Sequence, residues 1–331
     1  MPRFILRRAY FATLTILLVS IVVYGVFSLL PFDPAALTCG QKCTPAIVEA
    51  NRVKLGFDKP LWEQYWLFLS GIFLGRTYGA GSAEFTCPAP SFGYSFNENT
   101  CVTDMLKEAL PVTINLAIGA FVIWMVVGVG LGLIAAKFRG RYPDTLSSVF
   151  VLLGTSLPTF VTGLFFLIYV TIKWKIVPLS LKGYVSLTDD PVRYFQYFIL
   201  PWLTLAILYA AFYTRFTRAT VLETLGEDYI RTARAKGLSE KTVLLKHTMR
   251  AALAPITTSA SLDIAGLIGG AIITESIFNL AGLGRMTLQS VYEFDLSVVV
   301  ATTILAATVV ISMNLIVDIA YGYLDPRVRV K

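Results

Sequence analysis

The sequence predicts an all-α membrane protein with six transmembrane helices. Of its 331 residues, 56% are hydrophobic and 15% are charged, and its mean hydropathy is +0.68. Soluble domains are about 45–50% apolar and about 25% charged. Long charge-free runs recur along the chain, and most Lys and Arg residues lie between them. An apolar excess of this size needs a surface that faces lipid.

Six apolar runs are candidate spans, because a spanning helix needs about 20 apolar residues. They are residues 9–30, 112–136, 146–171, 198–214, 255–278 and 298–323. The first run follows three bases and is longer than a signal-peptide core of about 7–15 residues, so we expect it to be an uncleaved span. Pro201 lies near the start of the fourth run, where a first helical turn tolerates proline.

Basic residues predict the orientation, because short cytoplasmic loops are rich in Lys and Arg. Most bases lie before residue 9, in the loops 137–145 and 215–250, or after residue 323. We therefore expect these segments and both termini in the cytoplasm, and the segment 32–110 outside. The net charge is +7, but the bases form no basic, aromatic-interleaved stripe, so no nucleic-acid partner is expected.

All four cysteines, Cys39, Cys43, Cys87 and Cys101, lie in the segment 32–110. Disulfides persist in oxidising extracytoplasmic compartments, so we predict two of them. Of the pairings that four cysteines allow, we favour Cys39–Cys43 and Cys87–Cys101. A metal site at Cys39 and Cys43 is the alternative, but the only histidine, His247, lies on the opposite side, so no metal is expected.

The stretch 60–74 is crowded with Trp, Tyr, Phe and Leu and carries Glu63 as its only charge. Trp and Tyr favour the headgroup layer of a membrane. We expect a helix along the outer surface, and packing of that helix against the first span is an equally open and compatible interpretation.

The loop 215–250 is far longer than the connection that two antiparallel helices need. Tyr229, Ala233 and Lys236 recur at helical steps, and Gly237 then interrupts the pattern. Ser239 is suited to cap a second helix. We therefore predict two short helices that meet at Gly237, project from the membrane and insert into a cleft of another protein.

Residues 228–239 of this loop, Asp-Tyr-Ile-Arg-Thr-Ala-Arg-Ala-Lys-Gly-Leu-Ser, resemble the cytoplasmic "EAA" loop of bacterial ABC importer permeases. The version found in peptide and nickel importers is the most similar. The general family pattern places Ile-x-Leu-Pro about ten residues after the glycine. His247, Thr248, Met249 and Arg250 stand there instead, which disfavours a sugar or amino-acid importer.

The resemblance covers essentially the whole chain. It includes 29–34, 55–60 and 110–113, which resemble the longer-looped "B" permeases, and 274–278, 282–284 and 323–327 in the C-terminal half. The four cysteines are not part of the expected family pattern. The implied fold is that of a type I ABC importer permease, a single domain over 1–331 in the plasma membrane of a bacterium.

The resemblance implies a non-catalytic subunit that forms half of a pathway for short peptides. Its partners would be a second permease of similar fold ("C"-type), two cytoplasmic ATPase domains and an extracytoplasmic binding protein. The sequence has no G-x-x-x-x-G-K-[ST] motif, so ATP and Mg would be used by the ATPase. Coupling to it is expected from Asp228, Tyr229, Arg231, Thr232, Ala233, Arg234, Lys236, Gly237 and Ser239.

Three acids lie in or near the predicted spans: Asp263, Glu275 and Asp318. A charge at mid-membrane costs from about 3 to more than 10 kcal/mol, so such residues are candidates for function. Asp263, deep in its span, is predicted to face the pathway or the partner permease, with a structural hydrogen bond to a neighbouring helix as the alternative. Glu275 is a second pathway candidate, for which a structural role is favoured, as it is for Asp318.

Nickel chelates or another small solute are alternative cargoes, although no histidine cluster lines any span. A secondary transporter or channel is the alternative class. It would be expected to show inverted repeats, of which the two halves give no convincing sign, and it would not need a projecting helical loop. Gly128 with Gly132, and Gly266 with Gly270, have the spacing that permits close helix approach.

Overall fold

The computed structural model describes residues 2–28, 34–37, 44–56, 58–78, 85–95, 97–178 and 183–324. Within them, five helices are long and apolar enough to span a membrane, and one bent helix pair makes a sixth candidate. The predicted all-α class with six spans is therefore confirmed. The chain divides into unit 1 (Met1–Thr113, Ile268–Ile272, Ala281–Lys331) and unit 2 (Ile114–Leu267, Ile273–Leu280).

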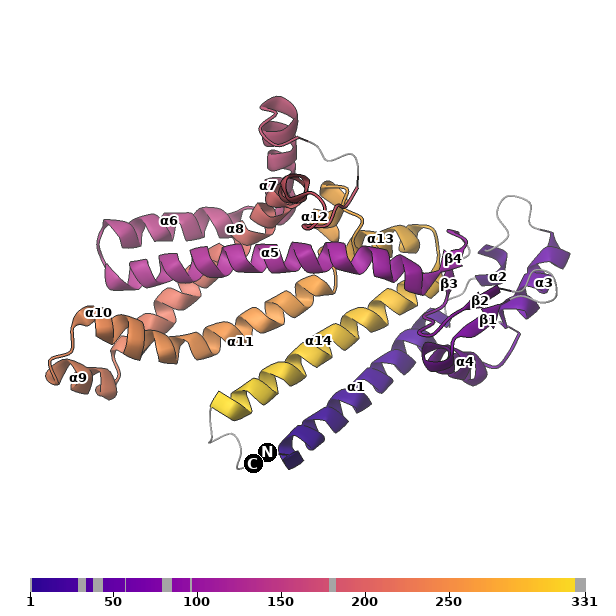
Figure 1. Cartoon of the computed structure of the whole chain (residues 1–331), viewed down its shortest axis with the longest axis horizontal. Helices are drawn as coiled ribbons and strands as arrows, with labels where there is room; N and C mark the ends of the chain where they lie inside the picture. The colour runs from indigo at the N-terminus through magenta and orange to yellow at the C-terminus, as the bar shows by residue number, and fades with distance from the viewer. Residues whose placement is uncertain are drawn as a thin grey trace. The chain divides into compact units, whose positions relative to one another are not determined.

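Unit 1 is built on α1 (Pro2–Ser28) and α14 (Leu296–Leu324), which lie side by side (Figure 1). Arg8 of α1 forms an ion pair with Asp318 of α14 at 2.8 Å. This ion pair agrees with the structural role that is favoured for Asp318.

The aromatic stretch 60–74 forms α4 (Leu61–Leu74). Phe68 of α4 packs with Val300 and Ile304 of α14, and Tyr65 shares a hydrogen bond with Ser20 of α1 at 2.8 Å. The opposite face leaves Trp62 and other large apolar side chains exposed. The predicted helix is confirmed and packs on the first span. Its place at the membrane surface stays a prediction.

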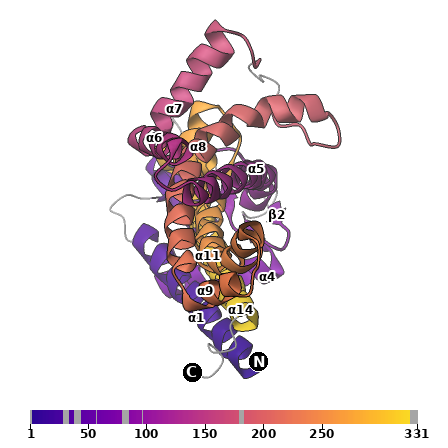
Figure 2. The same cartoon turned by 90° about the vertical axis from the view of Figure 1, so that its left-hand side faces the viewer.

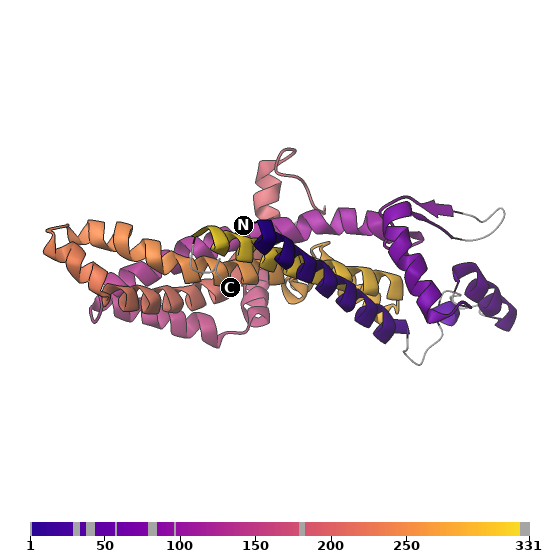
Figure 3. The ribbon, with the colours of Figure 1, turned by 90° about the horizontal axis from the view of Figure 1, so that it is seen from below.

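Two small hairpins precede the long helix α5 (Val102–Lys137), whose first turns belong to unit 1. Strand β1 (Arg76–Tyr78) pairs with β2 (Phe85–Cys87), and β3 (Tyr94–Ser95) pairs with β4 (Thr100–Cys101). Both lie next to the start of α5 in Figure 3. Short helices α2 (Pro34–Leu37) and α3 (Pro45–Leu55) come earlier in the segment.

The first turns of α5 pack with α13 (Leu283–Tyr292) and α14 around a buried apolar cluster. Its members include Val102, Leu106, Leu283, Val298 and Ala301. These residues tie the segment between the first two predicted spans to the C-terminal helix.

In unit 2, α5 and α6 (Tyr142–Ser156) pack against α8 (Pro191–Leu225). Glycines permit this approach: a Cβ on Gly128 would lie 2.7 Å from Tyr213 Cβ, and one on Gly132 would lie 2.6 Å from Thr217 Cβ. The Gly128/Gly132 pair therefore acts as its spacing predicts. Gly266 has nothing within 4 Å of its added Cβ, so the second pair does not.

The predicted span 146–171 is not one straight helix. Helix α6 ends at Ser156, and the chain turns by 97° into α7 (Thr159–Phe165) and the π-helix η2 (Phe166–Lys173). Leu157 is extended, with φ −95° and ψ 120°. The cause is Pro158, because proline disfavours helical backbone in the residue before it.

The fourth and fifth predicted spans also differ from the helices observed. Helix α8 begins at Pro191, after the N-cap Asp190, so Pro201 lies inside the helix and not in its first turn. Helix α11 (Met249–Ile268) ends before Gly270, whose φ of +124° is left-handed. A separate α12 (Ile272–Ile277) follows. Glycine supplies this conformation without steric cost, which divides the predicted run 255–278.

Candidate functional site

The loop 215–250 folds at its centre as its sequence predicts. Helix α9 (Asp228–Ala235) ends just before Gly237, whose φ is +78°. The Ser239 side chain then accepts a hydrogen bond from the N–H of Thr242 and caps α10 (Glu240–Thr242). Helix α10 continues through the π-helix η3 (Val243–Thr248) into α11, so the second helix is longer than predicted.

One face of α9 holds the loop together. Ile230 and Ala233 are buried with Val243 of η3, and Leu225 at the end of α8 packs against them. Figure 2 shows α9 beside the lower end of α11. Because α9 rests on α8 and η3, a force on α9 acts on both long helices.

The other face of α9 is polar and open. The Arg231 side chain is 74% exposed and Asp228 is 95% exposed, while Arg234 forms an ion pair with Glu240 at 2.8 Å across the glycine turn. Burial, followed by the charge of Glu227, raises the pKa of Tyr229. This face therefore carries exposed charged groups.

A basic pocket of about 290 Å³ lies beside α9 and is lined by Tyr229, Lys246, His247, Arg250 and Ala251. Lys246, His247 and Arg250 form no ion pair within the described ranges. The pocket places the chain's only histidine beside α9, within the loop 215–250, as expected from its position in the sequence.

An ion pair joins the corner between α5 and α6 to α8. Arg218 of α8 donates Nε to Asp144 Oδ1 at 2.7 Å and Nη2 to Oδ2 at 2.9 Å. The N–H of Gly140 also donates to Oδ2, at 2.9 Å. The Asp144 side chain is 9% exposed and that of Arg218 is 34% exposed, so the acid is shielded from water and the base is partly open to it. The pair lies two helical turns before the end of α8.

Asp263 of α11 accepts a hydrogen bond from the Tyr213 hydroxyl of α8. Tyr213 is buried, whereas Asp263 is partly exposed. The structural alternative predicted for Asp263, a bond to a neighbouring helix, is therefore present. One bond leaves the rest of the carboxylate open, so a role in the pathway remains a prediction.

Comparison with known proteins identifies the family. The family model described as "Binding-protein-dependent transport system inner membrane component" matches residues 128–330, and the model of its N-terminal region matches 1–117. The chain belongs to this family. Its members are the permeases of binding-protein-dependent ABC importers, as the loop motif indicates.

Curated relatives match over essentially their full length. A glutathione transport system permease protein of Escherichia coli (strain K12) is 34% identical over 331 residues, which is 100% of both chains. A peptide transport system permease protein of Brucella abortus (strain 2308) is 37% identical and is covered, like this chain, to 99%. The two relatives bear out the resemblance to the peptide branch of ABC importer permeases.

A solved structure supports the fold. The MetNI methionine ABC transporter has a chain that matches with a TM-score of 0.51 and 17% identity, over 67% of this chain and 97% of that one. The likeness shows the fold alone and agrees with the predicted type I importer architecture.

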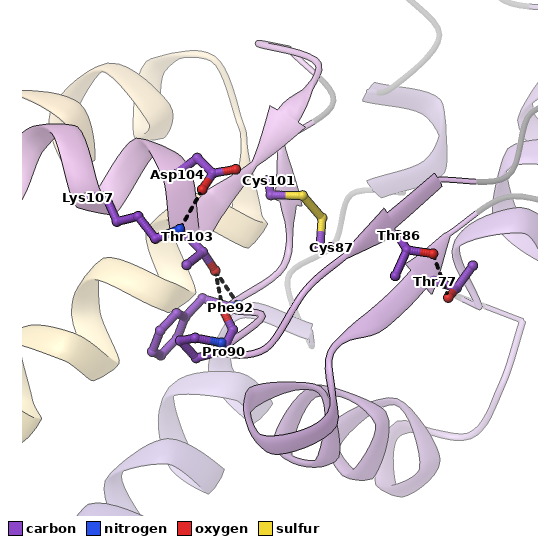
Figure 4. The surroundings of a disulfide bond; sticks show 9 residues. All are labelled: Thr77, Thr86, Cys87, Pro90, Phe92, Cys101, Thr103, Asp104 and Lys107. Atoms are coloured by element: carbon purple, nitrogen blue, oxygen red, sulfur yellow. Dashed lines mark hydrogen bonds and ion pairs between the residues drawn. A yellow bond between two sulfur atoms is a disulfide. The ribbon is translucent and has the colours of Figure 1, made fainter.

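Of the two disulfides predicted in the segment 32–110, one is confirmed. Cys87 and Cys101 are bonded, with 5.8 Å between their Cα atoms. Figure 4 shows the bond between β2 and the strand that leads into α5. Cys39 and Cys43 lie outside the described residues. Within the described ranges, no group of His, Cys, Asp and Glu could hold a metal ion.

Glu275, the second pathway candidate, lies on α12 and is completely buried. A position of this kind is consistent with the favoured structural role, and its part in the pathway stays untested.

Two contacts of the permease were not foreseen from the sequence. Asp144 and Arg218 are separated by 74 positions, and Ser95 and Asp295 by 200. Asp144 carried a local signal, because an acid in the first turn of a helix is favoured by the helix dipole. No local pattern gives its partner.

Proposed function

We propose that this permease forms half of the translocation pathway of an ATP-driven importer of short peptides. The family membership supports the transport role. The cargo is supported by relatives named as glutathione and peptide transport permeases, which match this chain from end to end.

The single observation that carries the mechanism is the anchored, polar helix α9. It is fixed to α8 and η3 by Ile230, Ala233 and Val243, and it presents Arg231 to the cytoplasm in the proposed orientation. A groove of the ATPase would grip α9, and closure of the ATPase around ATP and Mg would move α8 and α11 with it as rigid bodies. The permease itself would bind no nucleotide.

The complete transporter would contain a second permease of similar fold, two ATPase domains and an extracytoplasmic binding protein. Both termini and α9 would be cytoplasmic, as the distribution of bases indicates. The segment 32–110, with its hairpins and disulfide, would receive the binding protein on the outer side.

The test reverses charge on the exposed face of α9 in the assembled transporter. Arg231→Glu is expected to lower both peptide uptake and binding-protein-stimulated ATP hydrolysis by about tenfold or more, since buried charge reversal in an interface costs several kcal/mol. Arg141→Glu, an exposed base in the loop 137–145, is the matched control and should stay near wild type.

Copurification gives the second readout. Wild-type protein should bring down an ATPase and a second permease, and Arg231→Glu should bring down less ATPase. Undiminished uptake with Arg231→Glu and Lys236→Glu combined would overturn the proposed coupling role.

A further inference from the structure

Asp263 lies level with the apolar part of the long helix α5. Gly128 of α5 is level with Tyr213, which binds Asp263. Along α5, Gly128 lies about 13 Å before Lys137, the first base after a charge-free run. The run 109–136 has no charged residue. Asp263 is therefore an acid inside the apolar region, on the half nearer Lys137.

This carboxylate lacks a counter-charge in the described part of the chain. Its only hydrogen bond there comes to Oδ2 from the neutral Tyr213 hydroxyl, and no ion pair to Asp263 is present among those residues. Arg215 follows Tyr213 by two positions, which turns it about 200° around the axis of α8, away from this contact. Asp318, by contrast, has Arg8 as its base.

Aromatic rings surround the same place on α8. Tyr209 and Tyr213 are one helical turn apart and share a face. Both stack on Trp124 of α5, with ring centroids 4.5 Å and 6.4 Å away. Tyr209 and Asp263 are partly exposed. A carboxylate with an open oxygen beside electron-rich rings is a combination that binds ammonium groups.

We propose that Asp263 binds the α-ammonium group of a short peptide as the cargo passes through the permease, with the ring of Tyr209 beside that group. The proposal rests on the proposed function, from which the peptide cargo comes. An unpaired acid in an apolar region is unfavourable until a cation arrives. The single, partly exposed carboxylate also lets the cargo leave, as transport requires.

The test uses Asp263→Asn in the complete transporter, reconstituted in proteoliposomes with saturated binding protein. The asparagine oxygen still accepts the Tyr213 hydrogen bond, so a purely structural role predicts little change. Uptake is measured for two cargoes that the binding protein takes up: a peptide and its des-amino analogue, in which hydrogen replaces the α-ammonium group. The uptake rate of each variant is divided by that of the wild type for the same cargo, so any preference of the binding protein between the two cargoes cancels.

For the peptide, the ratio of Asp263→Asn to wild-type uptake should fall about tenfold or more, the loss expected for a charge-assisted hydrogen bond. For the analogue, the ratio should stay near one. Asp263→Glu should keep most of the peptide uptake, and Asp318→Asn should leave both ratios near one. Binding-protein-stimulated ATP hydrolysis establishes that each variant is assembled.

Equal ratios for the two cargoes would overturn the proposal, because they would assign Asp263 to structure or to a contact with the second permease. That outcome leaves the proposed function intact, since wild type imports the peptide. Absence of ATP-dependent peptide uptake by wild type would instead refute the proposed function, and this proposal with it.

Discussion

Arg218 of α8 holds Asp144 of α6 through two hydrogen bonds, and the N–H of Gly140 completes the contact. The three residues join the α5–α6 corner to α8, the helix that leads into the loop 215–250. Leu225, two turns further along α8, packs on α9. In the proposed mechanism, a movement of α9 would pass through α8 to α5 and α6 because these contacts join the helices.

Asp144→Asn should weaken this corner, because it leaves the Arg218 guanidinium without its counter-charge. We expect a loss of about 2 kcal/mol in stability, between the values typical of exposed and of buried ion pairs. Thermal unfolding of the detergent-solubilised permease measures it. Asp104→Asn, which breaks the exposed pair with Lys107, is the control and should cost less than about 1 kcal/mol. Equal losses for the two variants would contradict the argument.

Gly132→Ala should separate α5 from α8. The added Cβ would lie 2.6 Å from Thr217 Cβ and 2.7 Å from the Thr214 carbonyl oxygen, and such overpacking costs about 1–3 kcal/mol. Gly130 lies two residues earlier, about 200° around the axis of the same helix. A Cβ added there has nothing within 4 Å, so Gly130→Ala should leave stability unchanged or raise it. The two melting temperatures, measured side by side, check the prediction, and a Gly132→Ala protein as stable as Gly130→Ala would refute the packing described.

Features that depend on local patterns could be predicted from the sequence. Charge-free runs gave the spans, and the glycine and serine of the coupling loop gave its two helices because turn and cap preferences act within a few residues. Pro158 and Gly270 were present in the sequence as possible helix breakers, but the continuous hydrophobicity around them favoured the prediction of unbroken spans.

Contacts between distant segments could not be predicted in this way. The partner of Asp144 lies on α8, and that of Asp295 lies in a hairpin near the start of α5. Each pairing is decided by how helices pack, for which a single sequence carries no periodic signal. The partial exposure of Asp263 could not be predicted either, because it depends on which side chains the fold packs around it.

Removal of the Cys87–Cys101 bond should destabilise unit 1. The bond closes a loop of 14 positions, which corresponds to about 3 kcal/mol in the loop-entropy treatment. The double variant Cys87→Ser/Cys101→Ser is expected to unfold at lower temperature than wild type under oxidising conditions. A reducing agent should lower the melting temperature of the wild type. It should not lower that of a variant in which all four cysteines are replaced.

Asp295 should make the stability of unit 1 depend on pH. Burial raises the pKa of its carboxyl group, against the opposing hydrogen bonds from Ser95 and from the N–H of Val298. A raised pKa in the folded protein means that the folded state holds the proton more tightly than the unfolded chain does. The contribution to stability is then fully present below the unfolded pKa of about 3.9 and is lost as the pH rises through the folded value.

Asp295→Asn removes this ionisation. Its amide oxygen can still accept from the N–H of Val298, and its NH2 group can donate to the Ser95 hydroxyl, which now donates to the carboxylate. The melting temperature of the variant minus that of wild type should therefore increase as the pH is raised from about 4 to about 7. Other acids contribute equally to both proteins and cancel in the difference. Asp104→Asn, at an exposed acid, is the matched control and should give a smaller change. A difference that stays constant over this range, or that falls, would show that the hydrogen bonds to Asp295 outweigh its burial.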